Sequence, residues 1–456
     1  MRLTKIVTVF ALILFSTQNL FAQTPTPAPS KPDSVQPASD PFAFADFGWL
    51  NGNSRQTDFP LDSKMFTGEF TYDGNYVYDF AHPQDHTLVG STNSGRTSEM
   101  QVEQLGIGGD FHYQNVRGRL MTQFGMYSTM TPRNDASPSR GQWKTDDAYR
   151  YLSEAYGGYH WDTWHGINLD VGIFMSYVGL CSYYNYENWV YQMSYVSANT
   201  PWFFNGIRVQ TFPSDKLKIE YWFVNGFQTY NMYNSSPGGG FELLWRPTGD
   251  WSFVSNNYYG LDAAGLSART RLHTDNSVQY KYYDNPNRKI SKAAFSITLD
   301  AGGENGDGVT SGSTDSTKHS QFFTGVMVYN RFWFDHDKFA LTMGGGGINN
   351  PGRYLVLLPP INGATAATGT PYFTENPGDK FRAWDCSFNF DYMPSQFITY
   401  RIEFIHREAN VPYFAGSGGI TPPGGNNGSP GATIPGWSPD LSKHENRINA
   451  ALMVRL

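Results

Sequence analysis

The chain has 456 residues, a formal net charge of −7 and only 16% charged residues, against about 25% in an average soluble domain. This balance indicates no basic surface for nucleic acid, and two cysteines exclude a disulfide framework. Beyond the N-terminus no apolar run approaches the roughly 18 residues of a membrane-spanning helix, which excludes a helical membrane protein. A soluble β protein and a membrane β-barrel remain, because both place apolar residues in alternation.

Residues 1–22 have the pattern of a secretory signal, which predicts export. Arg2 and Lys5 precede an apolar stretch from Ile6 to Phe15, and Ala22 supplies a small residue at the expected cleavage site. The apolar stretch is too short to anchor the chain in a membrane. Residues 23–41 are rich in Pro, Ser, Thr and Ala, so we expect an extended linker that buries little apolar surface.

From residue 66 onward, apolar and polar residues alternate over long segments. Between Phe66 and Phe80 every even position is aromatic or glycine. Globular strands usually have about 5–6 residues, whereas a tilted membrane strand needs about 9–11. The same period recurs in residues 116–124, 154–161, 167–173, 207–211, 217–223, 278–282, 384–392, 398–404 and 448–456. The pattern therefore predicts membrane strands.

The connections between these segments alternate in length. The short turns are expected at 114–115, 162–165, 213–216, 247–250, 284–288, 335–338 and 393–396. The long loops are expected at 81–98, 129–147, 178–200, 228–237, 300–321, 349–380 and 408–440. Short turns at one end and long loops at the other are typical of outer-membrane barrels. We predict an all-β, transmembrane, antiparallel up-and-down barrel of about 16 strands, with 18 as the alternative because residues 321–334 keep poor phase.

The predicted domain order is a signal peptide at 1–22, a periplasmic linker and pre-barrel segment at 23–62, and an outer-membrane barrel at 63–456. The alternating segment 448–456 is similar to the C-terminal signal of bacterial outer-membrane barrels, although that signal usually ends in an aromatic residue and this chain ends in Leu456. Insertion would then depend on the barrel-assembly machinery, and outer-membrane lipid would surround the closed barrel.

Several motifs resemble the OmpL-like β-barrel porin family of Gram-negative bacteria. They lie at 153–156 (Ser-Glu-Ala-Tyr), 172–179, 188–191, 204–208, 224–227 (Val-Asn-Gly-Phe) and 400–404. The resemblance covers roughly residues 60–456. It implies a barrel and a pore, and it names no solute.

If the apolar faces contact lipid, the opposite faces line the lumen. The side chains predicted to line it are Arg117, Arg119, Glu154, Asp170, Arg208, Lys218, Glu220, Glu242, Arg246, Arg269, Arg271, Lys281, Asp385, Arg401, Glu403 and Arg407. Mixed charge suits a water-filled pore, in which opposed charges order water and select solutes by size and dipole. The alternative is that these charges pair and stabilise a plugged barrel.

The third long loop, residues 179–201, is aromatic. Its candidate constriction residues are Tyr183, Tyr184, Tyr186, Glu187, Trp189 and Tyr191. In general porins the third loop folds into the lumen, and an aromatic constriction would suit sugars or aromatic solutes. The alternative is a loop that packs on itself outside the membrane. The apolar stretch 354–360 in a later loop would either fold inward or cap the pore.

Signs of an enzyme or a metal site are weak. No Gly-x-Ser-x-Gly elbow is present, and His406 is interpreted as an outward-facing structural residue. Gly344–Gly347 lacks the Lys-Ser/Thr of a phosphate loop and indicates close backbone packing or a strand end. We interpret the acidic residues between 300 and 307 as part of a solvated loop, because they lack the spacing of a calcium loop.

The two cysteines also receive a structural interpretation. Cys386 lies among aromatics on an outward face and acts as a small apolar residue, whereas Cys181 lies in a long loop. A disulfide between them is not expected, although an oxidising compartment would permit one.

The sequence therefore favours a porin that passes small hydrophilic solutes passively. It predicts an outer-membrane location, no catalysis, no cofactor, and a homotrimer by analogy with porins of this size. One alternative is a non-conducting barrel used for envelope structure or surface attachment. A further alternative is an outer-membrane hydrolase.

Overall fold

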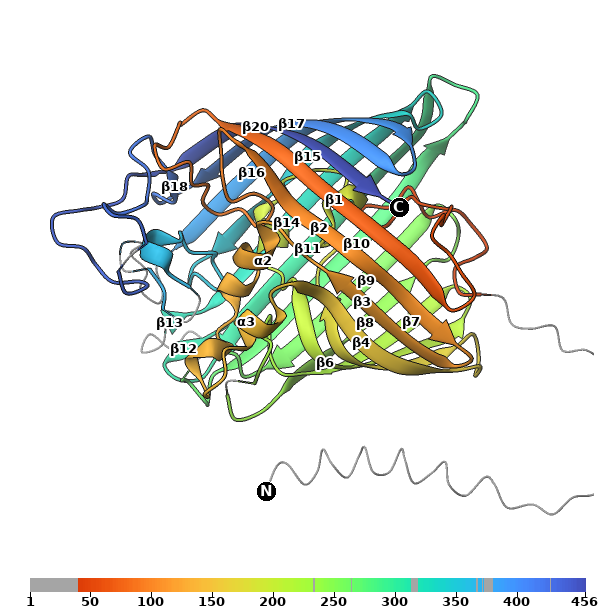
Figure 1. Ribbon diagram of the computed structural model, residues 1–456, viewed down its shortest axis with the longest axis horizontal. Coiled ribbons are helices and arrows are strands. Elements are labelled where there is room, and N and C mark those ends of the chain that lie inside the picture. The colour runs from red at the N-terminus through yellow and green to blue at the C-terminus, as the bar shows by residue number, and fades with distance from the viewer. Residues whose placement is uncertain are drawn as a thin grey trace, which may run out of the picture. The chain divides into compact units, whose positions relative to one another are not determined.

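The computed structural model describes residues 40–456 except 233, 264, 313–318, 366–367, 371, 373–379 and 427. The predicted signal peptide and most of the predicted linker lie outside these residues. In the described part of the chain, sixteen strands close into one barrel (Figure 1). No helix there is both long enough and apolar enough to cross a membrane.

The barrel strands follow one another around the ring in chain order. They are β1 (Phe66–Asp79), β2 (Met100–Tyr113), β3 (Val116–Thr122), β4 (Leu152–Trp161), β5 (Ile167–Met175), β6 (Phe203–Ser214), β7 (Leu217–Val224), β8 (Gly238–Trp245), β9 (Trp251–Gly260), β10 (Thr270–Asp284), β11 (Ile290–Asn305), β14 (Phe322–Phe334), β15 (Phe339–Asn350), β16 (Phe381–Ser395), β17 (Ile398–Ala409) and β20 (His444–Arg455). The predicted antiparallel barrel is confirmed, and the 18-strand alternative is wrong.

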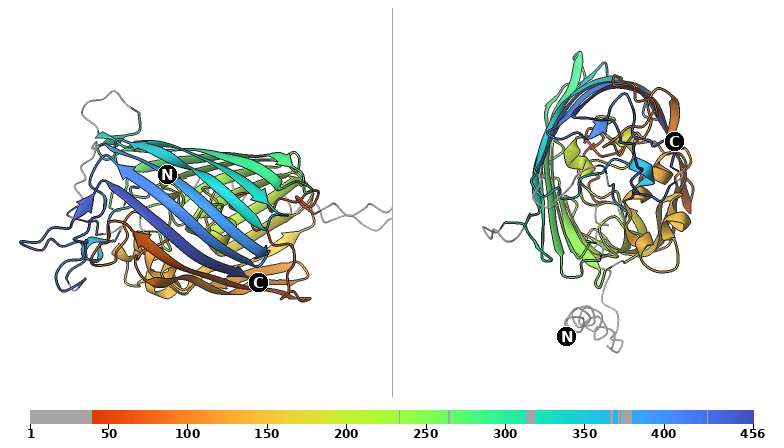
Figure 2. Two further views of the ribbon diagram at one scale, coloured as in Figure 1. Left: turned by 90° about the horizontal axis from the view of Figure 1, so that it is seen from above. Right: turned by 90° about the vertical axis from the view of Figure 1, so that its left-hand side faces the viewer.

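The small elements lie in the connections. They are β12 (Val309–Thr310), β13 (His319–Ser320), β18 (Phe414–Ala415), β19 (Leu441–Ser442), α2 (Tyr127–Met130), α3 (Thr145–Tyr149), α4 (Tyr195–Ala198) and four short 3-10 turns at 132–134, 137–139, 185–187 and 361–363. The strands tilt across the barrel, and connecting segments lie inside the ring when it is viewed from the loop end (Figure 2).

Closure depends on β20, which pairs antiparallel with both β17 and β1. Tyr72 lies opposite Val454 across the β1–β20 seam, and Tyr400 lies opposite Leu452 across the β17–β20 seam. Each of the sixteen strands thus has a partner on both sides. A closed barrel leaves no unpaired edge, and a membrane requires this because hydrocarbon offers no hydrogen-bond partner.

The outer face of the barrel wall is apolar and the inner face is polar, which is the reverse of the arrangement in a soluble protein. On β17, Ile402 and Phe404 point outward and are exposed, whereas Arg401, Glu403 and Arg407 point inward and are buried. Exposed apolar side chains repeat around the outer face, including Val171, Tyr221, Leu272, Leu299 and Val328. An apolar outer belt suits contact with lipid.

The packing of strand β14 explains why apolar and polar residues do not alternate clearly in residues 321–334. Its inward residues Phe323, Met327 and Tyr329 are almost fully buried, while Val326 and Val328 face outward. Both faces are apolar because the inward face packs against loop residues in the lumen. The alternation is therefore absent from the sequence although the strand is regular.

The predicted loop at 300–321 begins too early. Asp300, Glu304 and Asn305 belong to β11, and both carboxylates are buried in the barrel. The interpretation of these residues as a solvated loop is therefore wrong. Two glycines suggested a loop, but at Gly302 a Cβ would lie 2.7 Å from the ring of Tyr354, so glycine is needed there for packing inside a strand. The connection at 261–269 between β9 and β10 was not predicted.

The outward face of β14 gives a test of membrane depth. Val328 lies in the middle of the strand, and Val116 lies at the turn end of β3; both are exposed. We expect Val328→Arg to destabilise the barrel by about 2–4 kcal/mol, and Val116→Arg by about 0–1 kcal/mol, because the cost of an arginine falls toward the interface. Urea unfolding from lipid vesicles would measure both, and equal costs would contradict this orientation.

Candidate functional site

Residues 176–202, which connect β5 to β6, cross the interior of the barrel. Trp189, Val190 and Tyr191 are at most 3% exposed. Trp189 and Val190 pack in an apolar cluster with Trp49 and Trp333, and polar wall residues on several strands hydrogen-bond the loop as well. We refer to residues 176–202 as the crossing loop.

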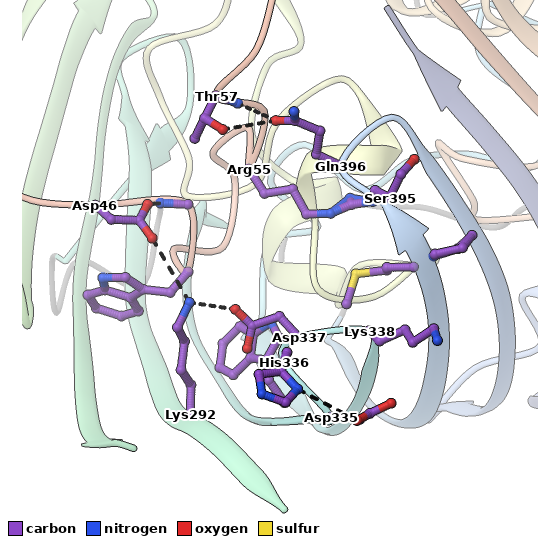
Figure 3. A pocket seen from close by; sticks show the side chains of 15 residues that line it. Asp46, Arg55, Thr57, Lys292, Asp335, His336, Asp337, Lys338, Ser395 and Gln396 are labelled. Carbon is purple, nitrogen blue, oxygen red and sulfur yellow. Dashed lines mark hydrogen bonds and ion pairs between the residues drawn. The ribbon is translucent and has the colours of Figure 1, made fainter. Parts of the chain in front are cut away.

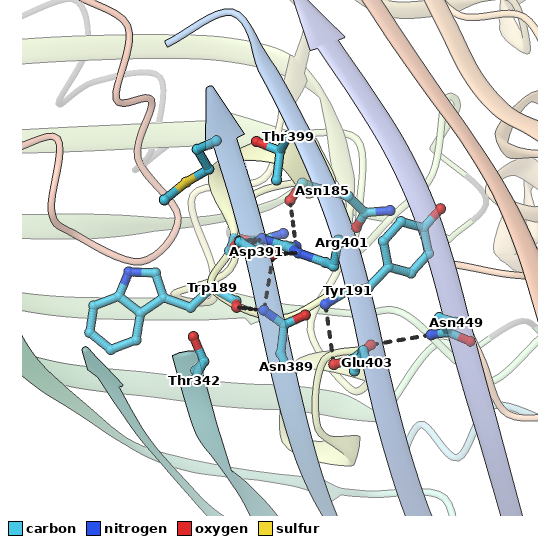
Figure 4. Close-up of polar contacts among 12 residues, drawn as sticks. Asn185, Trp189, Tyr191, Thr342, Asn389, Asp391, Thr399, Arg401, Glu403 and Asn449 are labelled. Carbon is cyan, nitrogen blue, oxygen red and sulfur yellow. Dashed lines mark hydrogen bonds and ion pairs between the residues drawn. The ribbon is translucent and has the colours of Figure 1, made fainter. Parts of the chain in front are cut away.

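One side of the crossing loop is attached to β16 and β17 (Figure 4). Arg401 Nε bonds Asp391 Oδ1 at 2.6 Å, and its Nη2 donates to the carbonyl of Asn188 at 2.7 Å. Arg331 on β14 and Asn389 on β16 each donate to the carbonyl of Trp189 at 3.1 Å. Guanidinium and amide donors thus satisfy loop carbonyls that would otherwise be buried without partners.

Wall carboxylates accept the N–H groups of the same loop. Glu403 accepts from the backbone of Gln192 at 2.8 Å and of Tyr191 at 3.2 Å. Asp385 accepts from Ser194 Oγ at 2.8 Å. At Gly346 on β15 a Cβ would lie 2.4 Å from Ser194 Oγ, so the glycine run permits close backbone packing.

The other side of the crossing loop is attached to β1 and β4 through tyrosine hydroxyls. Tyr191 donates to Asp73 at 2.9 Å, Tyr184 to Glu154 at 2.9 Å, and Tyr186 to Glu69 at 3.2 Å. Glu187 pairs with Arg455 on β20 at 2.7 Å. Burial raises the pKa of the Glu187 carboxyl, and the Arg455 guanidinium partly offsets this rise. The attachments of the loop therefore follow one arc of the wall, from β14 through β17, β20 and β1 to β4.

A second segment lies against the crossing loop at the turn end of the barrel. We call residues 42–57 the floor segment. Trp189 donates from its backbone to Asn51 Oδ1 at 2.8 Å and from its indole to the carbonyl of Trp49 at 3.1 Å.

The floor segment also contacts the wall at several places around the ring. Trp49 Nε1 donates to the carbonyl of Gly249 at 3.0 Å, and the backbone N–H of Asn51 donates to Gln279 Oε1 at 2.8 Å. Arg55 donates to the carbonyl of Ser395 at 2.8 Å. These contacts involve the β8–β9 turn, β10 and the end of β16.

The structure places the predicted lumen residues as follows. Fourteen of the sixteen positions lie on barrel strands. Twelve of these are Arg117 and Arg119 on β3, Glu154 on β4, Asp170 on β5, Arg208 on β6, Lys218 and Glu220 on β7, Glu242 on β8, Arg271 on β10, and Arg401, Glu403 and Arg407 on β17. Lys281 and Asp385 lie on β10 and β16, Arg246 follows β8, and Arg269 precedes β10.

Most of these charges are brought together in ion pairs. Arg119 contacts Glu69, Asp110 and Glu154 at 2.7–2.9 Å. Asp170 pairs with Arg208 at 2.8 Å and with Arg117 at 3.3 Å, and Lys218 pairs with both Glu220 and Glu242 at 2.7 Å. Arg271 pairs with Glu304 at 2.8 Å, and Arg407 lies 3.7 Å from Glu445.

Arg246 differs from the other predicted cations. Its guanidinium lies over the rings of Phe42 and Phe47 in the floor segment, at 4.9 and 4.6 Å from the ring centroids. Among the described contacts it has no ion pair within 4 Å. Its charge is therefore the least compensated of the predicted set.

Cavities lie on both sides of the crossing loop. At the turn end, one cavity of about 480 Å³ is lined by the floor segment, Lys292 and residues 335–338 (Figure 3). A second, of about 360 Å³, is lined by Arg119, Glu154 and Tyr184, and a third, of about 210 Å³, by Tyr177, Glu242 and Arg246. On the side of the long loops, cavities of about 340 and 230 Å³ share Arg133.

The later apolar loop also reaches the interior. Tyr354 is fully buried and stacks on Phe323 with ring centroids 5.2 Å apart. The Tyr354 hydroxyl lies 3.1 Å from His273 Nδ1.

In the described residues, no group of three or more His, Cys, Asp or Glu side chains could hold a metal ion. Both cysteines are free, and burial raises the pKa of the Cys181 thiol to about 12.

Sequence reasoning missed several interior residues. Asp73 and Arg331 contact the crossing loop, and Asp391 pairs with Arg401, which holds that loop. The polar alternation of β1 and β16 indicates Asp73 and Asp391, whereas β14 has no such alternation to indicate Arg331. The floor segment was grouped with a linker, although Phe42, Phe47 and Trp49 make it too aromatic for one.

Comparison with solved structures finds similar barrels of low sequence identity. OmpT of Vibrio cholerae is 9% identical, with 87% of this chain and 99% of that chain covered and a TM-score of 0.47. DcaP of Acinetobacter baumannii is 13% identical, with 89% and 100% covered and a TM-score of 0.46. OprB of Pseudomonas putida in its high-pH structure is 9% identical, with 86% and 94% covered and a TM-score of 0.48.

A comparison with curated proteins finds no matching sequence. The family described as "Putative beta-barrel porin-2, OmpL-like" matches residues 43–429, which is most of the chain. The motifs at 153–156, 172–179 and 400–404 lie inside this match. The chain therefore belongs to this OmpL-like family of porin-like outer-membrane β-barrels.

Proposed function

We propose that the barrel passes small hydrophilic solutes across the outer membrane by passive diffusion. The observation that supports this proposal is a series of cavities on both sides of the crossing loop. Those of 360 and 210 Å³ are lined by wall residues that include Arg119 on β3, Glu154 on β4 and Glu242 on β8, and those of 340 and 230 Å³ lie among the long loops. The cavities of 360 and 210 Å³ share Met175 and Ser182, so they are neighbours on the turn side. The proposed path runs between this wall and the crossing loop.

The chemistry of the wall supports hydrophilic solutes. Arg119 with its three carboxylates and Lys218 with its two place opposite charges side by side. Such pairs create a local transverse field that orders water and disfavours apolar solutes. The aromatic rings of the crossing loop are buried against one another, and Tyr184 contributes to the lining of the 360 Å³ cavity.

One observation favours a second function, a non-conducting barrel. The crossing loop packs on the floor segment and is bonded to Arg331 on β14 and to Glu154 on β4, which are eight strands apart in the ring. A single-channel recording of residues 23–456, refolded in a planar bilayer, separates the two functions. Discrete current steps support the porin. Silence from protein whose circular dichroism is that of a folded β-barrel supports the non-conducting barrel.

Arg246 gives a test of ion selectivity. It lines the 210 Å³ cavity with Glu242, so Arg246→Glu would place two carboxylates beside the proposed path. We expect the reversal potential in a salt gradient to move toward cation selectivity. Arg288→Glu is the matched control, because Arg288 is exposed in the β10–β11 turn. Equal reversal potentials for the two variants would contradict the path. Arg401 is unsuitable for this test because it holds the crossing loop.

The floor segment gives a test of the path at the turn end. Gly52 lines the 210 Å³ cavity and Gln56 lines the 360 Å³ cavity. Deletion of residues 42–57 removes these walls, and we expect conductance to rise roughly two-fold or more, because a pore conducts in proportion to its narrow cross-section. An equally long deletion of residues 23–38 is the control. Unchanged conductance after the first deletion would place the path elsewhere.

A further inference from the structure

Trp202 lies at the end of the crossing loop, immediately before β6. Its backbone N–H donates to Gln228 Oε1 at 2.9 Å, and its carbonyl accepts from the backbone of Ser176 at 3.1 Å. These two bonds fix the main chain where β5 and β6 emerge from the wall. The indole is therefore presented at a defined position in the interior, where it is 5% exposed.

Two cavities meet at this indole. On the turn side it lines the 210 Å³ cavity together with Glu242 and Arg246. On the side of the long loops it lines the 230 Å³ cavity together with Met126 and Met130. Of the described residues that line these two cavities, Trp202 is the one that lines both. The Trp202 side chain therefore lies between the two cavities.

Beside Trp202, a hydrogen-bonded pair of side chains also separates the two cavities. Tyr183 lines the turn-side cavity, and Thr131 lines the opposite one. Their hydroxyls lie 2.7 Å apart, and the Tyr183 ring centroid lies 5.8 Å from that of Trp202. Tyr183 is also held by its bond to Gln123 at 2.7 Å. Trp202 has no comparable side-chain bond in the described contacts.

The indole N–H of Trp202 is buried and has no hydrogen-bond partner among the described residues. A buried donor without a partner costs free energy, so the inward position of this ring is not held by a polar contact. Rotation of the ring into either cavity would expose the N–H to water or to polar lining atoms. The neighbouring Met126 and Met130 side chains are unbranched and flexible, so they can give way to the ring.

We propose that Trp202 is the gate that separates the two halves of the solute path and sets the largest solute that passes. This inference rests on the proposed porin function and names the residue that limits it. When the ring lies inward, the path is closed between the two cavities. When it rotates, the cavity beside Arg246 joins the cavity beside Arg133.

The test is a graded series at this position, Trp202→Phe, Trp202→Leu and Trp202→Ala. Trp143→Ala is the control, because this tryptophan is 81% exposed in the loop between β3 and β4. Circular dichroism and heat-modifiable gel mobility identify the folded variants. If the alanine variant does not fold, the leucine variant carries the test.

Single-channel conductance and liposome swelling in sugars of increasing size are the two readouts. We expect conductance to increase as the side chain becomes smaller, roughly two-fold or more for alanine, with entry of larger sugars and no change for Trp143→Ala.

The contrary outcomes distinguish the two proposals. If the wild type conducts and all folded variants match it in conductance and sugar cutoff, Trp202 is not the gate and the porin function stands. If the wild type and every folded variant are silent, the porin function fails and the gate fails with it.

Discussion

The absence of hydrogen-bond partners in hydrocarbon is the constraint on which this structure depends. It requires each barrel strand to be paired on both sides, and β20 meets that requirement by joining β17 to β1. Closure then assigns every side chain to lipid or to the interior. Apolar residues such as Phe404 face the lipid, and charged residues such as Arg401 and Glu403 face the interior. The charged interior is thus a consequence of the apolar exterior.

A charged interior wall determines how a loop can enter the barrel. The crossing loop brings backbone N–H and C=O groups into a space with little water, where each unsatisfied group would cost about 1–3 kcal/mol. Glu403 and Asp385 accept its N–H groups, while Arg401 and Arg331 donate to its carbonyls. Three of these four residues, Glu403, Asp385 and Arg401, are ones that the pattern assigns to a lumen, so predicted lumen residues also hold the loop. The proposed path for solutes lies beside Arg119, Glu154 and Glu242, where cavities remain between the loop and the wall.

The sequence predicted the barrel, the strand number and the two kinds of connection, because these follow from period two and from turn composition. It failed where interior packing replaced alternation. The inward residues of β14 are apolar, and Gly302 in β11 accommodates Tyr354, so both strands lost their usual pattern. The charged residues were recognisable one at a time. Their partners, such as Asp391 for Arg401 and Asn51 for Trp189, depend on contacts between distant segments that no local pattern contains.

The floor segment has a consequence for the order of assembly. It precedes β1 in the chain, yet its contacts are with Gly249, Gln279, Trp189 and Ser395, which come from turns, strands and a loop far along the sequence. None of these partners is in place until the strands around the ring have paired and the crossing loop has entered. We therefore expect the floor segment to dock last, so that its docking would mark a barrel whose interior is complete.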